Sequence, residues 1–412
     1  MTTFGDFLLG QEPFATSDGS GSGLHQLLVI IGFLGAFVGC GGLSRPLRLF
    51  AMPLSLLITL AWCWASVIWS IAPEVSIRRL VLASVTVTTA FMLARELGYD
   101  RMVAMLRYFV TAALIACFLR MIISPSTGIQ LANVGMDEGS AGSWRGIMMD
   151  KNTCGSFCAV TALLFIFNGR SLNTVFRVGM IIAAVFFLVK TQSKTSMGVL
   201  ALATVAGLCF YKYNPTYRLL LIPAMMCVAV AVWIMGGRML MPFYAALYDP
   251  TAFTGRGLIW IALVHSIRDH WLLGSGFGAF WGTGASSPIK QYSTYEWIRD
   301  GVSVGHNGYL DIWVQIGLVG LVLLVLSFIV IPTAKLFYRH FEERGAPSLL
   351  IALLVFSVGN NFTETTFLNR DLFLNVIMLL IIALTDLAPR AGSQSTVVGG
   401  GEKRGPALPG KV

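Results

Sequence analysis

Charged residues are scarce in this sequence. Only 12% of its 412 residues are Asp, Glu, Lys or Arg, about half of the roughly 25% that soluble globular domains carry. Hydrophobic residues make up 56% of the chain, and the mean hydropathy is +0.74. This composition excludes an ordinary soluble protein and indicates an integral membrane protein whose fold is organised by the bilayer.

Basic clusters of the kind that bind nucleic acid are also missing. The net charge is +9, yet the chain has no basic run and no recognised nucleic-acid-binding module. In a membrane protein, an excess of Lys and Arg is the usual result of basic loops on the cytoplasmic side. We therefore expect the lipid bilayer, and no nucleic acid, as a partner.

Metal-ligand patterns are absent from the sequence as well. No Cys and His residues have zinc-like spacing, and Asp137 and Glu138 are neighbours in a loop, where a solvated role is expected. We expect no metal and no cofactor. The seven cysteines all fall in apolar stretches, which predicts small core residues: Cys40, Cys63, Cys117, Cys154, Cys158, Cys209 and Cys227.

Long apolar runs recur along the chain, and their lengths suit helices that cross a bilayer about 30 Å thick. They lack the alternation of a membrane β-barrel, which predicts an all-α, polytopic membrane helix bundle of about 11 (10–12) transmembrane helices. Residues 24–388 form this membrane domain, between an N-terminal tail (1–23) and a disordered cytoplasmic C-terminal tail (389–412) rich in Gly, Ser and Pro. The predicted spans are 24–43, 54–72, 80–97, 102–123, 153–169, 174–190, 195–211, 217–235, 307–332, 347–362 and 371–388.

The distribution of basic residues between the spans predicts the orientation. Sixteen of the 29 Lys and Arg residues fall in alternate loops and the C-terminal tail, and five of the other thirteen sit in one long segment, 236–306. Long loops count little in the positive-inside rule, so the comparison is sixteen against eight. We expect a bacterial inner membrane protein with segment 236–306 as a large periplasmic loop.

This long loop is rich in aromatic residues and is expected to be structured. Gly257–Leu272 is predicted to be a helix with one apolar stripe, which either lies in the membrane interface or packs on the bundle; both alternatives stay open. Gly274-Ser-Gly-Phe-Gly278 is predicted to be a tight turn that ends this helix, because no preceding strand supports a dinucleotide site.

Two residues of this loop are candidates for catalysis and phosphate binding. His306 stands at the entrance to the next span, and histidine is largely neutral in a near-neutral exterior and able to accept a proton. Arg256 offers the planar fork that binds phosphate through two hydrogen bonds. Glu364 lies at another external helix end in a polar patch with Asn360, Asn361 and Arg370, where its position suits a helix cap.

These residues stand in an order that resembles the O-antigen ligase and Wzy-type polymerase superfamily, in particular its exopolysaccharide-polymerase branch. The resemblance covers about residues 70–385. Its motifs are Thr254-Gly-Arg256-Gly-Leu-Ile-Trp260, Leu273-Gly-Ser-Gly-Phe-Gly278, His306-Asn307 with Gly317 and Gly320, and, upstream, Arg145-Gly-Ile-Met-Met-Asp-Lys151-Asn152 and Thr191-Gln-Ser-Lys194-Thr.

The resemblance implies a metal-independent membrane glycosyltransferase whose donor is a polyprenyl (undecaprenyl) diphosphate-linked glycan. Position by position, Arg256 and His306 match the functional Arg and His of the family's loop, so both are expected to be catalytic. From its chemistry, we expect His306 to activate the acceptor hydroxyl. Lys194 occupies a position where many relatives have Arg, so it keeps the charge but loses the fork. The residues expected to bind the diphosphate or the glycan are Lys194, Arg145, Lys151, Arg78 and Glu364.

Three functions are compatible with this pattern. The favoured one is polymerisation of lipid-linked repeats into exopolysaccharide or O-antigen at the periplasmic face, which Lys151-Asn152 supports. The second is ligation of a finished glycan to lipid A–core or another acceptor, and the third is transport of a lipid-linked glycan or a solute. A glycan acceptor, a chain-length regulator and export machinery are the further expected partners.

Overall fold

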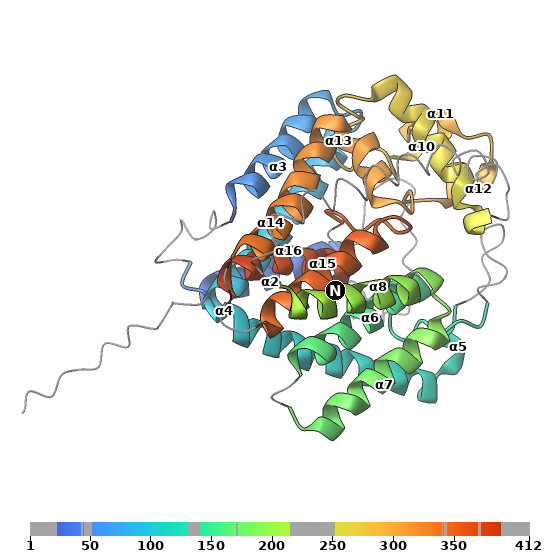
Figure 1. Ribbon diagram of the computed structural model, residues 1–412. Coiled ribbons are helices and arrows are strands. Elements are labelled where there is room, and N and C mark those ends of the chain that lie inside the picture. Colours follow the sequence, from blue (N-terminus) through green and yellow to red (C-terminus); the bar gives the residue numbers. More distant parts are fainter. Residues whose placement is uncertain are drawn as a thin grey trace, which may run out of the picture.

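The computed structural model describes residues 23–42, 44, 52–130, 141–169, 172–214, 252–339, 341, 344–369 and 372–388. In these residues the fold is all-helical, with no strand, and Ile129 and Trp144 form an isolated β-bridge. The predicted all-α class is therefore confirmed for the described part of the chain, which packs as a bundle of helices (Figure 1).

Ten of the eleven predicted spans fall on helices. The remaining span, 217–235, and nearly all of both tails lie outside the described residues. Four helical stretches are by themselves long and apolar enough to cross a bilayer, namely 73–123, 174–191, 194–212 and 308–338, as a multi-pass membrane protein requires. The helices are α2 (Gly23–Gly39), α3 (Leu54–Ala65) with the 3-10 turn η2 (Ser66–Trp69), α4 (Pro73–Ile123), α6 (Lys151–Asn168), α7 (Thr174–Thr191), α8 (Lys194–Lys212), α13 (Gly308–Val325), which continues through the π-turn η7 (Leu326–Val330) into α14 (Ile331–Tyr338), α15 (Gly345–Asn360) and α16 (Phe373–Leu387).

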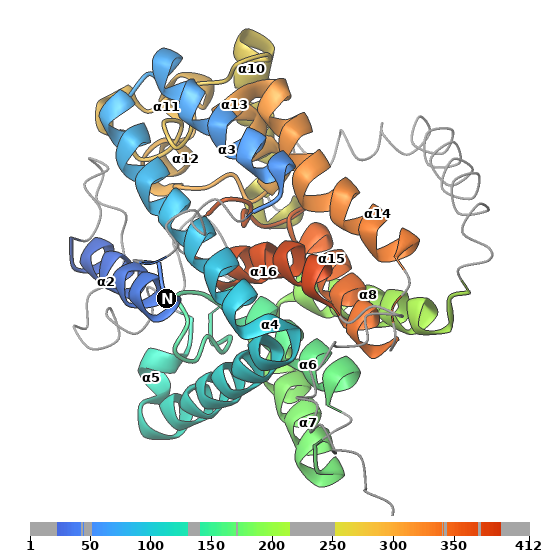
Figure 2. The same ribbon diagram turned by 90° about the vertical axis from the view of Figure 1, so that its left-hand side faces the viewer.

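Helix α4 is two helices joined at a kink, where the sequence predicted two spans. Gly98 has φ 70° and ψ 179° inside it, a conformation that only glycine adopts without strain. The chain changes direction there, and the two halves are steeply inclined to each other (Figure 2).

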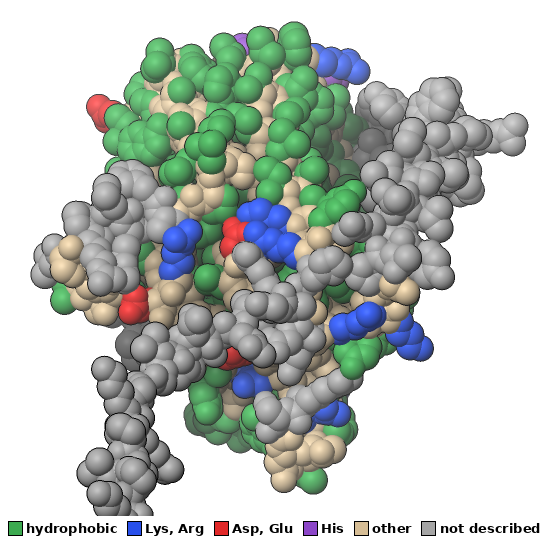
Figure 3. Space-filling view, turned by 60° about the vertical axis from the view of Figure 1, so that its left-hand side comes forward, with side chains coloured by type: hydrophobic (Ala, Val, Ile, Leu, Met, Phe, Trp, Pro, Cys, Tyr) green, Lys and Arg blue, Asp and Glu red, His purple; other side chains and the backbone are tan. Residues whose placement is uncertain are grey.

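The outer surface is apolar, as contact with lipid requires. On the face in Figure 3, hydrophobic side chains cover most of the upper part, and most of the Lys and Arg in view lie in a band below. Val175 and Ile182 of α7 are 81% and 63% exposed. Cys209 of α8 is exposed too, so the prediction that every cysteine is a core residue is wrong there, because its face of α8 points outward. Five others are buried, and Cys227 lies outside the described residues.

Cations cap helix ends at one end of the bundle. Arg339 donates to the carbonyl of Thr385 at 2.6 Å, and Arg344 donates to the carbonyl of Tyr213 just after α8. Such bonds satisfy carbonyls that a helix terminus leaves unpaired. Both arginines lie between the predicted spans 307–332 and 347–362, in a loop that the basic-residue count predicts to be cytoplasmic.

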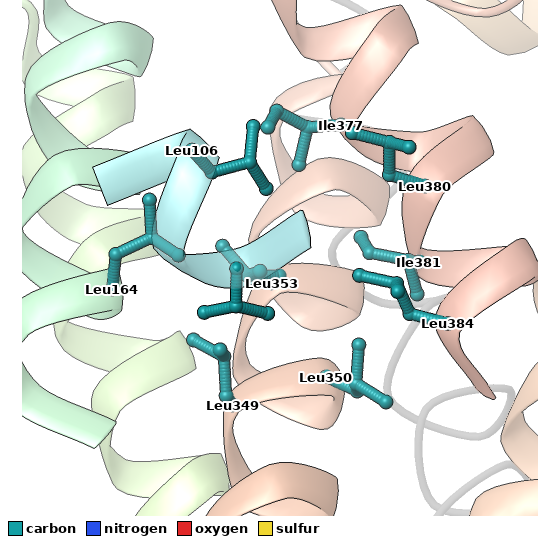
Figure 4. Close-up of a pocket in the computed structure, with 10 residues that line it drawn as sticks. Leu106, Leu164, Leu349, Leu350, Leu353, Ile377, Leu380, Ile381 and Leu384 are labelled. Carbon is teal, nitrogen blue, oxygen red and sulfur yellow. The ribbon is translucent and has the colours of Figure 1, made fainter. Parts of the chain in front are cut away.

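A small cavity lies inside the bundle between α4, α6, α15 and α16 (Figure 4). Its lining is aliphatic throughout, so it offers no group that could orient a polar ligand. We regard it as a packing gap. The residues around it are Val103, Leu106, Leu164, Leu349, Leu350, Leu353, Ile377, Leu380, Ile381 and Leu384.

Helix α13 is broken at Gly317, and the loop after α10 (Arg256–His270) fills the break. Gly317 has φ 70°, and a Cβ there would lie 1.9 Å from the carbonyl oxygen of Leu272. The predicted glycine turn therefore packs against α13 as well as ending α10. Three backbone hydrogen bonds join residues 271–276 to the broken part of α13: Ser275 N to Val314 O (2.9 Å), Gly276 N to Gln315 O (2.8 Å) and Leu318 N to Trp271 O (2.9 Å).

Candidate active site

Residues 252–306 fold around a small hydrophobic core of their own. Helix α10 and the short helices α11 (Ile289–Tyr292) and α12 (Glu296–Gly301) gather beside α13 at one end of the molecule (Figure 1). Ile259 and Leu263 of the predicted apolar stripe are fully buried, whereas Val264 and Trp271 are 38% and 52% exposed. Most of the stripe thus packs on the protein, and its two outer residues remain available to the membrane.

Three residues from distant parts of the sequence meet at the base of this loop. Arg256 is the first residue of α10, His306 lies just before α13, and Glu364 lies in the turn after α15. One oxygen of Glu364 is 2.7 Å from Nη2 of Arg256, and the other is 3.4 Å from Nδ1 of His306. The side chains of Arg256, Glu364 and His306 are 13%, 17% and 20% exposed, so the cluster is largely shielded yet open to a substrate.

Glu364 therefore connects two other site residues, a role that the sequence did not predict. The carboxylate bridges a guanidinium and an imidazole, whereas the sequence left a sugar contact or a helix cap open. Burial raises the pKa of Glu364, but the charge of Arg256, the hydrogen bond from His306 and the charge on that ring together bring the pKa below its usual value. The group is therefore ionised at neutral pH.

The contact with Glu364 bears on which nitrogen of His306 carries the proton. A carboxylate beside Nδ1 favours the tautomer protonated there, which leaves the Nε2 lone pair free to accept a proton. The ring is thereby prepared to act as a base toward a substrate hydroxyl.

Residues with strained, positive-φ backbone conformations lie near the candidate site residues. His306 has φ 49°, a left-handed conformation that is unfavourable for residues other than glycine. The other non-glycine residues with positive φ in the described ranges all lie within a few residues of a candidate site residue: Gln192 before Lys194, Phe253 before Arg256, and Leu368 after Glu364. Strained residues that a structure retains are often found at functional sites.

Asn307 fixes the start of α13 directly after the strained histidine. Its side-chain oxygen accepts from the backbone N–H groups of Tyr309 and Leu310, both at 3.1 Å, as an N-cap does. Its amide nitrogen donates to the carbonyl of Phe362 at 3.2 Å. Because Phe362 is two residues from Glu364, Asn307 connects the start of α13 to the turn that carries Glu364.

Arg256 is already engaged within the protein. Besides its ion pair with Glu364, it donates from Nη1 to the carbonyl of Thr363. A guanidinium has five N–H donors, so these two bonds leave others for a phosphate. The residue thus makes structural bonds and still has donors for the ligand role that the sequence predicts.

Lys194 lies close to the cluster at the start of α8. The hydroxyl of its neighbour Thr195 is 2.9 Å from that of Thr363, which places the exposed Lys194 beside the turn that carries Glu364. The start of α6 lies against the start of α8, since a Cβ on Gly155 would lie 2.7 Å from the Cβ of Ser193.

Lys151 and Arg145 stand at this same junction. Lys151 is the first residue of α6, and Arg145 lies in the segment before it, where it donates to the carbonyl of Met149 at 3.0 Å. This bond of Arg145 stays within its own segment. The role of these two cations in binding substrate therefore stays a prediction.

Arg78 lies on α4, and within the described residues no hydrogen bond or ion pair joins it to the cluster. Its neighbour Arg79 holds the loop by donating to the carbonyls of Gly278 and, at 2.8 Å, Trp281. This part of α4 therefore supports the loop.

Asp311 is the residue of this region that sequence reasoning missed. It lies one turn into α13 within an apolar stretch and is 1% exposed. It accepts from Trp281 Nε1 at 2.6 Å, from Gly305 N at 2.8 Å and from the hydroxyl of Thr365. A carboxylate inside a predicted apolar span is the signal that could have found it.

Comparison with known proteins matches part of the chain to a described family. Residues 179–325 match the family model described as O-antigen ligase, and Lys194, Arg256 and His306 all lie within the match. This part of the chain is therefore similar to the O-antigen ligase family. Glu364 lies beyond the end of the matched residues, so the cluster joins them to the helices that follow.

A second comparison gives an exopolysaccharide protein. The chain is 27% identical over 245 residues to the exopolysaccharide production protein ExoQ of Rhizobium meliloti (strain 1021), with 56% of this chain and 54% of that protein covered. The chain thus spans about half the length of this curated relative. The two findings confirm the resemblance to the O-antigen ligase and Wzy-type family that the short motifs indicated.

Proposed function

We propose that this protein is a metal-independent membrane glycosyltransferase that polymerises polyprenyl-diphosphate-linked repeats at the periplasmic face of a bacterial inner membrane. The observation that carries the proposal is the Arg256–Glu364–His306 cluster, with its first and last members inside the O-antigen ligase match. It combines a base with fixed positive charge, which are the two needs of glycosyl transfer from a diphosphate.

In this mechanism the acceptor hydroxyl attacks the anomeric carbon of the donor sugar. The new bond joins the acceptor oxygen to that carbon, and the bond from the carbon to the phosphate oxygen breaks. Nε2 of His306 takes the hydroxyl proton, and the polyprenyl diphosphate leaves with the electron pair. Glu364 holds the ring and stabilises the imidazolium that forms, as the carboxylate of a catalytic triad does.

Positive charge compensates the departing diphosphate. The remaining N–H donors of Arg256 and the ammonium of Lys194 are the candidates for this charge, and Arg145 and Lys151 are the further cations that the sequence predicts for it. Cations that converge where negative charge develops lower the barrier more than they tighten substrate binding. This arrangement supports a lipid diphosphate as the leaving group.

Ligation is the second candidate, supported by the description of the family model as O-antigen ligase. Polymerisation and ligation share donor and chemistry and differ in acceptor. The name of the R. meliloti relative, an exopolysaccharide production protein, and the Lys151-Asn152 motif support polymerisation as the first choice.

The test is transfer by purified protein in proteoliposomes supplied with lipid-linked repeats. Longer lipid-linked chains from repeats alone indicate a polymerase, and products formed only after lipid A–core is added indicate a ligase. We expect His306→Ala to lower the turnover number by roughly 10²–10⁴-fold, the range that a general base supplies.

The matched control is His265→Ala, because His265 is an exposed histidine on α10. It should retain wild-type turnover. Near-normal transfer by His306→Ala would disprove the catalytic role, and counterflow of a lipid-linked glycan by that variant would instead support a transporter.

A further inference from the structure

Asp311 is a buried acidic side chain that the proposed reaction does not use. In water a carboxylate is strongly solvated, and moving it into a protein interior is costly unless other groups satisfy it. In the described part of the chain, three donors do so: an indole N–H, a backbone N–H and a hydroxyl. A hydrophobic residue would fill the same space without this cost, so the bonds themselves need an explanation.

One oxygen atom of Asp311 connects the two partners of the candidate active site. Oδ2 accepts from the backbone N–H of Gly305, the residue before His306, and from the hydroxyl of Thr365, the residue after Glu364. The separation of the imidazole and the carboxylate is thus set through a single shared acceptor.

The same bond holds the strained histidine. The peptide N–H of Gly305 is bound by Asp311 at 2.8 Å, and the carbonyl of Gly305 accepts from Nε1 of Trp260 at 3.0 Å. Both groups are fixed just before His306 adopts φ 49°. A conformation of this kind is unfavourable for a residue other than glycine and persists only where its surroundings enforce it.

The close approach of Asp311 also explains why residue 305 is a glycine. A Cβ on Gly305 would lie 2.7 Å from Oδ1 of Asp311 and 2.7 Å from a methyl carbon of Leu263. A larger residue would therefore push the loop away from the carboxylate.

We infer that Asp311 is the positioning residue of the active site, holding His306 and Glu364 at the separation that keeps the imidazole ready to act as a base. This inference rests on the proposed transfer reaction for its kinetic consequence, but its geometric part does not require that reaction. It assigns a role to a residue that no motif of the sequence marked.

Asp311→Asn is the main test, because asparagine keeps the shape but has a single acceptor oxygen. Whichever way the amide turns, its NH2 group faces at least one of the three donors. We expect the variant to fold and to lose at least 10-fold in kcat, with KM for the lipid-linked repeat changing less than threefold. Thr365→Val should show a smaller loss in kcat, and Thr365→Ser, which keeps the hydroxyl, should restore wild-type turnover.

A spectroscopic measurement separates this inference from the proposed function. The chain has five histidines, so nitrogen-15 histidine labelling gives a small set of ring signals, and His306→Gln assigns that of His306. We expect Asp311→Asn and Thr365→Val to shift the His306 signal. The control Asp269→Asn should not, because Asp269 binds Tyr292 on the exposed side of the loop.

The outcomes are distinct. A shifted His306 signal in Asp311→Asn supports the positioning role even if the wild-type protein transfers no glycan, in which case only the proposed function fails. An unchanged signal, or a fall in kcat no larger than that of Asp269→Asn, overturns the inference.

Discussion

At the residue scale, the meeting of Glu364 with both Arg256 and His306 makes the site sensitive to acid. The pKa of Glu364 lies below its usual value, so its contribution to folding stability is fully present above the unfolded-state pKa of about 4.3. That contribution is lost as the pH falls through the lower folded-state value. The pair is therefore intact throughout the neutral range.

Glu364→Gln tests both consequences. We expect turnover to fall by about 10²-fold, because an amide holds Nδ1–H less firmly and does not stabilise the imidazolium. The melting temperature in detergent should fall less between about pH 5 and pH 3 than that of the wild type. Asp300→Asn is the control, since Asp300 pairs with Lys290 at an exposed position. Equal acid sensitivity of wild type and Glu364→Gln would contradict the ion pair.

At the element scale, the break in α13 creates the frame on which the loop rests. A Cβ at Gly317 would meet backbone atoms, the carbonyl oxygen of Leu272 at 1.9 Å and its carbon at 2.3 Å, and the residue also has φ 70°. Neither a rotamer change nor a small shift relieves such a clash. We expect Gly317→Ala to destabilise the protein by more than about 4 kcal/mol, well beyond a typical point substitution.

The measurement is the melting temperature together with the yield of monodisperse protein in detergent. Gly179→Ala is the matched control, because Gly179 is also a helix glycine but a Cβ there would have no heavy atom within 4 Å. It should be neutral or slightly stabilising, given the helix propensity of alanine. A folded, stable Gly317→Ala protein would show that the break is not required.

The break also separates what could be predicted from the sequence about these elements from what could not. Apolar length alone located the helices, because lipid forces the backbone to bond within each segment. The glycine turn 274–278 was predicted as well. That the turn enters a gap in another helix some 40 residues later could not be predicted, since hydropathy does not report long-range backbone contacts.

At the scale of the whole molecule, the site is built from three regions that only the fold brings together. His306 and Arg256 could be singled out by residue chemistry and family motifs. Glu364 was found but not understood, because its partners are 58 and 108 residues away. Asp311 was missed since its donors come from three separate segments, and such convergence becomes visible only in three dimensions.

Orientation in the membrane is the remaining prediction at this scale, and it decides which compartment supplies the acceptor. It rests on the sixteen-to-eight excess of Lys and Arg, which places the loop containing α10–α12 in the periplasm. Single cysteines test it in a background without native cysteines, in which exposed Cys209 in particular is replaced by serine. We choose Glu296→Cys in α12 and Asp100→Cys near the α4 kink, both exposed positions.

A membrane-impermeant maleimide should label Glu296→Cys in cells whose outer membrane alone has been permeabilised. Asp100→Cys should react only after the inner membrane is opened, because it belongs to the opposite end of the bundle. The reverse pattern would place His306 in the cytoplasm, where lipid-linked repeats that have been carried across the membrane no longer reach it. The labelling result therefore decides between a periplasmic polymerase or ligase and a different function for the same cluster.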